Sequence, residues 1–139
     1  MDIPTHLSHK PIVKLENYSR IDGIYKNATD VQGLSLGISQ WSNEDLSVKV
    51  WRHSGKKWSR MSEELPLHRV LDLASLVCSA LSYAQSEVLL SDDKFSITTS
   101  NNLELLEILK KNLNAEYVKE NLDEPLKRLS RLLKNLGYT

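Results

Sequence analysis

The chain has little of several residue types, and each shortage excludes a class of protein. Its 139 residues include one cysteine, one phenylalanine, five glycines and four prolines. The single cysteine, Cys78, cannot form a disulfide within the chain, which excludes a disulfide scaffold and fits a reducing compartment. No apolar run approaches the length of a membrane span, and residues 1–11 lack the apolar core of a signal peptide. We therefore expect a cytoplasmic protein that does not contact membranes.

The chain also lacks net charge, which argues against a protein built to hold duplex DNA. Eighteen basic residues balance eighteen acidic ones, whereas a duplex-DNA-binding domain carries a positive excess. The balance is uneven along the chain: residues 1–61 hold nine basic and six acidic residues, and residues 62–139 hold nine and twelve. Such asymmetry can orient a partner or favour self-association.

Strict alternation of apolar and polar residues predicts two adjacent strands. In residues 34–41 and 46–53 the leucines, isoleucine and valines fall on every second position, which is the period of a strand. We expect these apolar residues to face the core and Ser47, Lys49, Trp51 and His53 to face outward. Shorter strands are predicted at residues 12–15, 21–25, 57–61 and 95–99.

After Pro66, apolar residues repeat at the spacing of a helix, which predicts one long helix. Ser62 has the chemistry of a helix N-cap, and Glu63 and Glu64 favour the positive end of a helix dipole. The predicted helix runs from there to Gln85 or Leu90. Two further helices are predicted around residues 103–113 and 126–136, introduced by capping-box patterns at Asn101 and Asn121 and with the last one stopped at Gly137.

Together these elements predict an α+β fold. A small antiparallel sheet of three to five strands would pack on one long central helix, with two further helices at the C-terminus. A chain of this length is expected to form a single domain, residues 1–139, with the sheet and central helix in residues 1–100 and a helical pair in residues 101–139.

A face that combines indole rings with cations is the main candidate for binding. Between Leu46 and Ser62 there are five basic residues and no acidic one. Aromatic rings stack on bases and cations neutralise phosphate, but tryptophan and arginine are also enriched at protein interfaces. The candidate binding residues are Trp41, Lys49, Trp51, Arg52, His53, Lys57, Trp58 and Arg60.

Catalytic machinery is scarce. Glu64, His68 and Asp72 are spaced by four and would share one helical face, where a histidine between carboxylates can act as a general base. No serine or cysteine is placed as its nucleophile, and such ladders commonly only stabilise a helix start. These three residues are weak catalytic candidates.

No cofactor or metal site is predicted. His6 and His9 are three residues apart, but a metal site needs three or four ligands, and no metal-ligating or phosphate-binding motif is present. Cys78 lies among apolar residues and is expected to behave as a small hydrophobe.

Three segments carry a resemblance to a known group of proteins: GLSLGISQW at residues 33–41, VWRHSGKKWSR at 50–60 and SEELPLHRVLDLA at 62–74. They resemble a small family of uncharacterised bacterial proteins, chiefly from Gram-positive bacteria, over roughly residues 1–80. The resemblance implies a bacterial, cytoplasmic, stand-alone domain, and because the family has no known activity it carries over no catalytic residues.

Three functions are compatible with these candidate residues. The leading prediction is a non-enzymatic binding or adaptor domain that acts through protein contacts, including self-association through the last helix, whose basic face lies opposite its leucines. The first alternative is a protein that binds single-stranded nucleic acid through the tryptophans and cations. The second is a small hydrolase that uses His68.

Overall fold

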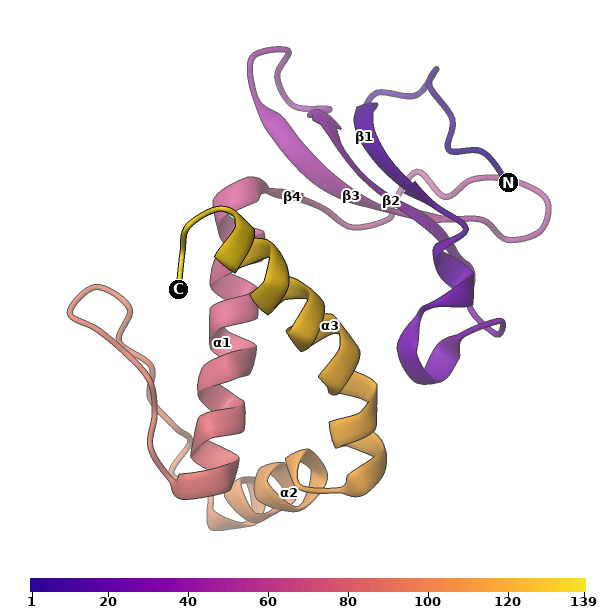
Figure 1. Ribbon diagram of the computed structural model, residues 1–139. Coiled ribbons are helices and arrows are strands. Elements are labelled where there is room, and N and C mark those ends of the chain that lie inside the picture. The colour runs from indigo at the N-terminus through magenta and orange to yellow at the C-terminus, as the bar shows by residue number, and fades with distance from the viewer. The chain divides into compact units, whose positions relative to one another are not determined.

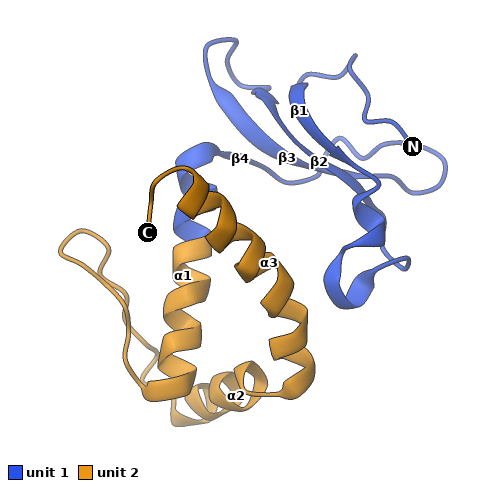
Figure 2. Cartoon of the chain, in the orientation of Figure 1, with its two compact units in different colours: residues 1–73 blue, residues 74–139 orange.

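The computed structural model describes all residues from 1 to 139 and divides them into two compact units, residues 1–73 and residues 74–139 (Figure 2). Four strands and three α-helices confirm the predicted α+β class (Figure 1). The elements are β1 (Lys10–Glu16), the 3₁₀ turns η1 (Tyr18–Arg20) and η2 (Gly23–Tyr25), β2 (Val31–Ile38), β3 (Leu46–Arg52), β4 (Glu64–Pro66), α1 (Leu67–Ser86), α2 (Leu103–Leu113) and α3 (Glu116–Asn135). None of the helices combines the length and the apolar character that crossing a membrane requires.

The first unit is built on an antiparallel sheet in the order β1-β2-β3-β4. Its register places Ser35 of β2 opposite Lys49 of β3, and Lys49 opposite Glu64 of β4. Directly paired residues point to the same side of a sheet, so these three polar side chains form one row across three strands.

The face of the sheet that holds this row is the covered one. Along β2 and β3 it carries Val31, Gly33, Ser35, Gly37, Ser47, Lys49 and Trp51, all buried. Residues of the N-terminal segment pack on it: Ile3, only 3 % exposed, lies against Gly33. The segment after β3 covers it from the other end, where Trp58 meets Trp51 edge-on at 5.8 Å between ring centroids.

The predicted alternation is therefore confirmed, but the sides were assigned wrongly. Trp51 is completely buried, and Lys49 is only 6 % exposed, whereas we expected both to face outward. The apolar residues Leu34, Leu36, Ile38, Val48 and Val50 are half-buried on the opposite face. The physical reason is steric. The small side chains of the glycines and serines on the covered face leave space for the N-terminal segment and for the indole ring of Trp51.

Several element predictions need correction. Residues 57–61 form no strand; their only ladder-type pairing is an isolated bridge between His53 and Trp58. Residues 64–66, predicted to start the long helix, instead form the edge strand β4, where a proline is tolerated because an edge amide needs no partner. Residues 21–25 contain a 3₁₀ turn, and residues 95–99 are irregular.

The second unit is helical. The Asn102 side chain caps α2 by accepting hydrogen bonds from the amides of Glu104 and Leu105, one residue after the predicted cap. The last helix starts at Glu116, well before the predicted cap at Asn121, and continues through Pro125. Its stop at Gly137 is confirmed, since this glycine has φ +94° just beyond the helix end.

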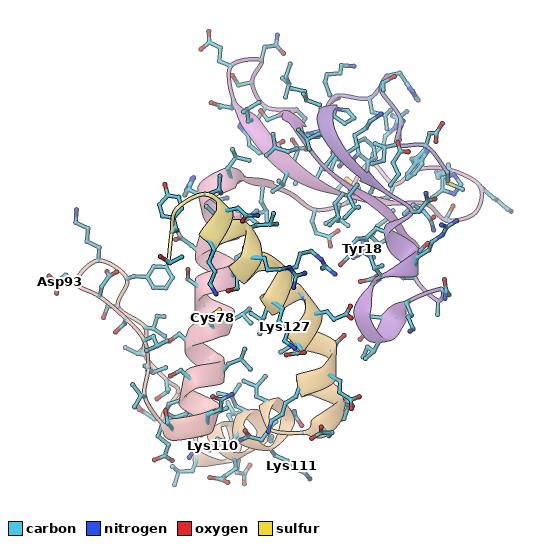
Figure 3. The ribbon with its side chains drawn as sticks, viewed as in Figure 1. Tyr18, Cys78, Asp93, Lys110, Lys111 and Lys127 are labelled. Atoms are coloured by element: carbon cyan, nitrogen blue, oxygen red, sulfur yellow. The ribbon has the colours of Figure 1, made fainter.

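Polar contacts hold the loop after α1 within this unit. Ser79, 1 % exposed, exchanges hydrogen bonds with the backbone of Leu90. The ammonium of Lys110, labelled in Figure 3, pairs with Glu87. Many large apolar side chains of α1, α2 and α3 and of the residue after α3 are exposed, among them Leu71, Leu73, Leu76, Val77, Leu103, Leu105, Ile108, Leu132 and Leu136. Packing of the long helix on the sheet stays a prediction.

Candidate functional site

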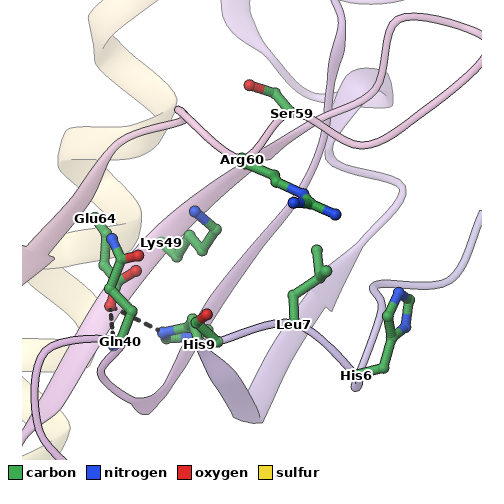
Figure 4. A pocket seen from close by; sticks show the side chains of 9 residues that line it. His6, Leu7, His9, Gln40, Lys49, Ser59, Arg60 and Glu64 are labelled. Atoms are coloured by element: carbon green, nitrogen blue, oxygen red, sulfur yellow. Dashed lines mark hydrogen bonds and ion pairs between the residues drawn. The ribbon is translucent and has the colours of Figure 1, made fainter.

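A cavity of about 320 Å³ opens on the covered face of the sheet in the first unit (Figure 4). Its walls come from the N-terminal segment, from the turn after β2, from β3, from the segment before β4 and from β4 itself. The lining residues are His6, Leu7, Ser8, His9, Gln40, Lys49, Ser59, Arg60 and Glu64. Leu7 is the only aliphatic side chain among them, so the cavity is a polar site.

A directed chain of hydrogen bonds runs beneath the cavity. The indole N–H of Trp51 donates to Ser35 Oγ at 2.8 Å, and the Ser35 hydroxyl lies 3.0 Å from His9 Nε2. Because Ser35 Oγ already accepts from the indole, its own hydrogen is free to point at Nε2. The proton of a neutral His9 lies on Nδ1, because the Ser47 hydroxyl gives its own hydrogen to Glu64 Oε2 and can only accept from Nδ1.

The chain ends at Glu64. His9 Nδ1 lies 2.9 Å from Ser47 Oγ and 3.4 Å from Glu64 Oε2. Ser47 donates to Oε2 at 2.8 Å, and the backbone amide of Gln40 donates to the same oxygen at 3.0 Å. The network thus fixes one oxygen of the carboxylate with several donors.

The other oxygen of Glu64 has no partner. The Glu64 side chain is 2 % exposed, and its Oε1 is buried without a hydrogen bond. Leaving a buried acceptor unpaired costs about 1–3 kcal/mol, and more when the group is charged. Buried polar groups in folded proteins are nearly always paired, so this oxygen, in a residue that lines the cavity, is available to accept a further hydrogen bond.

Lys49 is the second incompletely paired group. Its ammonium makes one long hydrogen bond of 3.5 Å to the carbonyl oxygen of Ser62 and lies 5.2 Å from the centre of the Trp51 ring. Burial lowers the pKa of Lys49 from its ordinary value, against the opposite pull of Glu64 and Glu63. A buried ammonium has three protons to satisfy, and the protein supplies one weak acceptor.

The pKa of His9 is lowered from about 6.5, first by burial, which outweighs the attraction of Glu64. The unfolded chain therefore takes up a proton at His9 at a higher pH than the folded chain. It follows that the free energy of unfolding is fully retained above about pH 7 and decreases as the pH falls through 6.5.

This dependence is testable with His9→Gln. The variant should have a flatter profile of unfolding free energy between pH 7 and pH 5, measured by urea denaturation with tryptophan fluorescence. The control is His68→Gln, because His68 is exposed on α1. A His9→Gln profile as steep as that of the wild type would contradict the neutral, buried state of this imidazole.

The predicted binding residues are not brought together on one surface. Trp51 and Lys49 are buried. Arg52 is engaged by Asp30 at 2.7 Å and by two bonds to Glu63, at 3.0 and 2.9 Å, and this arginine lowers the pKa of Glu63 to about 2.

The remaining residues of that set are scattered. Trp58 is half-buried and stacks edge-on against His53, with 4.9 Å between ring centroids. Trp41 is 47 % exposed and bonds to Asp45. Lys57 is exposed, and Arg60 is exposed at the cavity. Only Lys49 and Arg60 of the predicted set line the cavity.

The proposed helical ladder of Glu64, His68 and Asp72 is wrong, because Glu64 belongs to β4 and only the other two lie on α1. His6 and His9 do line the same cavity, but no three metal-ligating side chains gather anywhere in the structure. Ser47 is fully buried and does not line the cavity; its contacts with His9 and Glu64 orient the carboxylate.

His9, Ser35, Ser47 and Gln40 belong to the site or to its hydrogen-bond network, and none of them was predicted as a binding residue. A signal existed in the three small or polar residues that alternate along β2, Gly33, Ser35 and Gly37. Such a stripe indicates a face crossed closely by another segment.

The whole chain matches one family. The model of a family of unknown function, DUF6530, matches residues 1–138, and the chain belongs to that family. The match extends well past the 80 residues over which a resemblance was expected. No curated protein matches the chain, and no solved structure does.

Proposed function

We propose that the first unit binds a small organic carboxylate in the cavity, as a binding module rather than as an enzyme. The observation that carries this proposal is Lys49: a buried ammonium at a cavity wall with one long hydrogen bond. Arg60 adds a second cation to the lining. Charge-assisted hydrogen bonds from such groups to a carboxylate are roughly twice as strong as neutral ones.

The size of the cavity limits the ligand. About 320 Å³ lies at the lower end of the range of roughly 300–1,000 Å³ that holds small molecules. This volume suits a metabolite with a few carbon atoms and does not suit a dinucleotide. The largely polar lining favours a ligand that is itself polar.

A thermal-shift panel tests this function directly. Acetate, propionate, lactate and succinate are added at pH 7.5, with chloride at the same ionic strength as the control. A bound ligand stabilises the folded state by mass action, so at least one carboxylate should raise the midpoint of unfolding, followed by tryptophan fluorescence, in a saturable way. No shift beyond that of chloride with any of the four, or with any other small molecule that carries a carboxylate, would contradict the proposal.

A second candidate function is self-association through the last helix. Leu132 is 55 % exposed, Leu136 is 72 % exposed and Tyr138, just past the helix, is 71 % exposed. Neighbouring exposed apolar side chains of this kind are typical of interfaces, and a second copy of the chain would cover them by symmetry. Light scattering on the wild type and on Leu132→Lys tests it: a dimer that the variant dissociates supports it, and a monomer at all concentrations contradicts it.

A further inference from the structure

The lining of the cavity contains the carboxylate of Glu64 as well as the cations of Lys49 and Arg60. The negative charge of Glu64 restricts the chemistry of the ligand further. Glu64 reaches the lining from β4, directly opposite Lys49 in the sheet register. Although the two residues are paired across the strands, no ion pair forms between the Lys49 ammonium and the Glu64 carboxylate; the basic side chain within salt-bridge distance of Glu64 is His9. Each charged group therefore keeps bonding capacity for something else.

The neighbours of Glu64 all use the same oxygen. Ser47, the Gln40 amide and His9 contact Oε2, and none contacts Oε1. Figure 4 shows the bonds from His9 and Gln40 converging on this carboxylate. Because Oε2 is held from several directions, the carboxylate cannot turn to pair its second oxygen without losing those bonds. Oε1 is thus a fixed acceptor without a hydrogen-bond partner in the protein.

A fixed acceptor is satisfied by a hydrogen-bond donor, and the strongest donor for a buried carboxylate is a cation. Lys49 has the opposite need, because its ammonium is a donor that lacks acceptors. A ligand that meets both requirements carries a cationic donor and an anionic acceptor in one small molecule. An anion without a donor would leave Oε1 unpaired and would bring its negative charge toward Glu64.

We propose that the ligand of this cavity is a zwitterion of the amino-acid type, with its carboxylate at Lys49 and its ammonium at Glu64 Oε1. This inference rests on the proposed function and specifies its ligand class. The side chain of the amino acid would lie among Leu7, Ser8 and Ser59, which favours a small or polar one. The relay from Trp51 through Ser35 and His9 acts by positioning Glu64, not by contacting the ligand.

The experiment compares ligands that differ by one charged group. Isothermal titration at pH 7.5 uses two triplets: alanine, propionate and ethylamine; serine, 3-hydroxypropionate and ethanolamine. The remaining standard amino acids are titrated singly. We expect at least one amino acid to bind about tenfold or more tightly than its own des-amino acid, the difference typical of a hydrogen bond to a charged group, and the amine alone to bind more weakly still.

A matched pair of variants assigns the effect to Glu64. Glu64→Gln keeps an oxygen for Ser47 and Gln40 and places an amide at Oε1, which should abolish the preference for the amino acid over its des-amino acid. Glu63→Gln changes the adjacent glutamate, which is bound to Arg52 and lies outside the lining, and should keep the full preference. The comparison of ligands on the wild type requires no variant to fold.

The outcomes separate the two proposals. If carboxylates bind and no amino acid binds more tightly than its des-amino acid, the zwitterion inference is overturned and the carboxylate site stands. If Glu64→Gln retains the preference, the assignment of the ammonium to Glu64 is wrong. If neither carboxylates nor amino acids bind, both proposals fall together.

Discussion

Replacing Trp51 by alanine is expected to lower the free energy of unfolding of the first unit by about 3–5 kcal/mol, the usual loss for a buried tryptophan. The indole is completely buried, meets His9 and Trp58 edge-on, and donates to Ser35. The change would remove the ring that supports the covered face and the donor that begins the relay to Glu64. All three tryptophans lie in the first unit, so the fluorescence of the two that remain reports its urea unfolding.

Trp41→Ala is the matched control for this experiment. Trp41 is 47 % exposed and has a single side-chain bond, to Asp45 at 3.2 Å. We expect a loss below about 1 kcal/mol, as for most surface substitutions. If the two variants lose similar stability, the burial of Trp51 described here is wrong.

Gly37→Ala is expected to destabilise the same unit by about 1–3 kcal/mol or more, because overpacking at a rigid contact strains the backbone. A Cβ at Gly37 would overlap the carbonyl oxygen of Lys10 and come within 2.8 Å of Pro11 Cα. Both atoms are backbone of the adjacent strand β1, so no side-chain rotation relieves the clash. Urea unfolding followed by tryptophan fluorescence measures the loss.

Gly33→Ala on the same strand face provides the comparison. A Cβ there would lie 2.6 Å from Ile3 Cδ1, the end of a flexible side chain, and 3.1 Å from the carbonyl oxygen of Leu15. Since Ile3 can rotate away, Gly33→Ala should lose less stability than Gly37→Ala. The reverse order would mean that β1 does not approach β2 as closely as described.

The sequence pattern was sufficient for the strands that alternate strictly and for the first two helices, but it placed the start of α3 about ten residues too late. The alternation in β2 and β3 and the spacing of apolar residues in α1 and α2 are local properties, and they predicted these elements within a few residues. The edge strand β4 was missed because Glu64 and Pro66 also suit a first helical turn. Pairing with β3, which a local pattern does not contain, decided between the two.

The candidate site depends on long-range pairing and was therefore only partly predictable. Lys49 and Arg60 were expected to bind something, but on an open face. The binary pattern assigns the core to the side with leucines and valines, and here the side with Ser35, Lys49 and Trp51 is covered instead. His9 and Ser47 are 38 residues apart in the sequence. Their contact depends on the path of the N-terminal segment, which the spacing of neighbouring residues does not predict.

We propose that binding of a small carboxylate depends on Lys49, which is buried at the cavity wall. Isothermal titration of Lys49→Met and Lys57→Met with propionate and with the amino acids tests it most directly, since Lys57 is exposed and outside the lining. We predict wild-type affinity for Lys57→Met and a loss of about tenfold or more for Lys49→Met, with both variants folded by circular dichroism. Equal affinity of the two variants, or no binding by the wild type, would contradict the account.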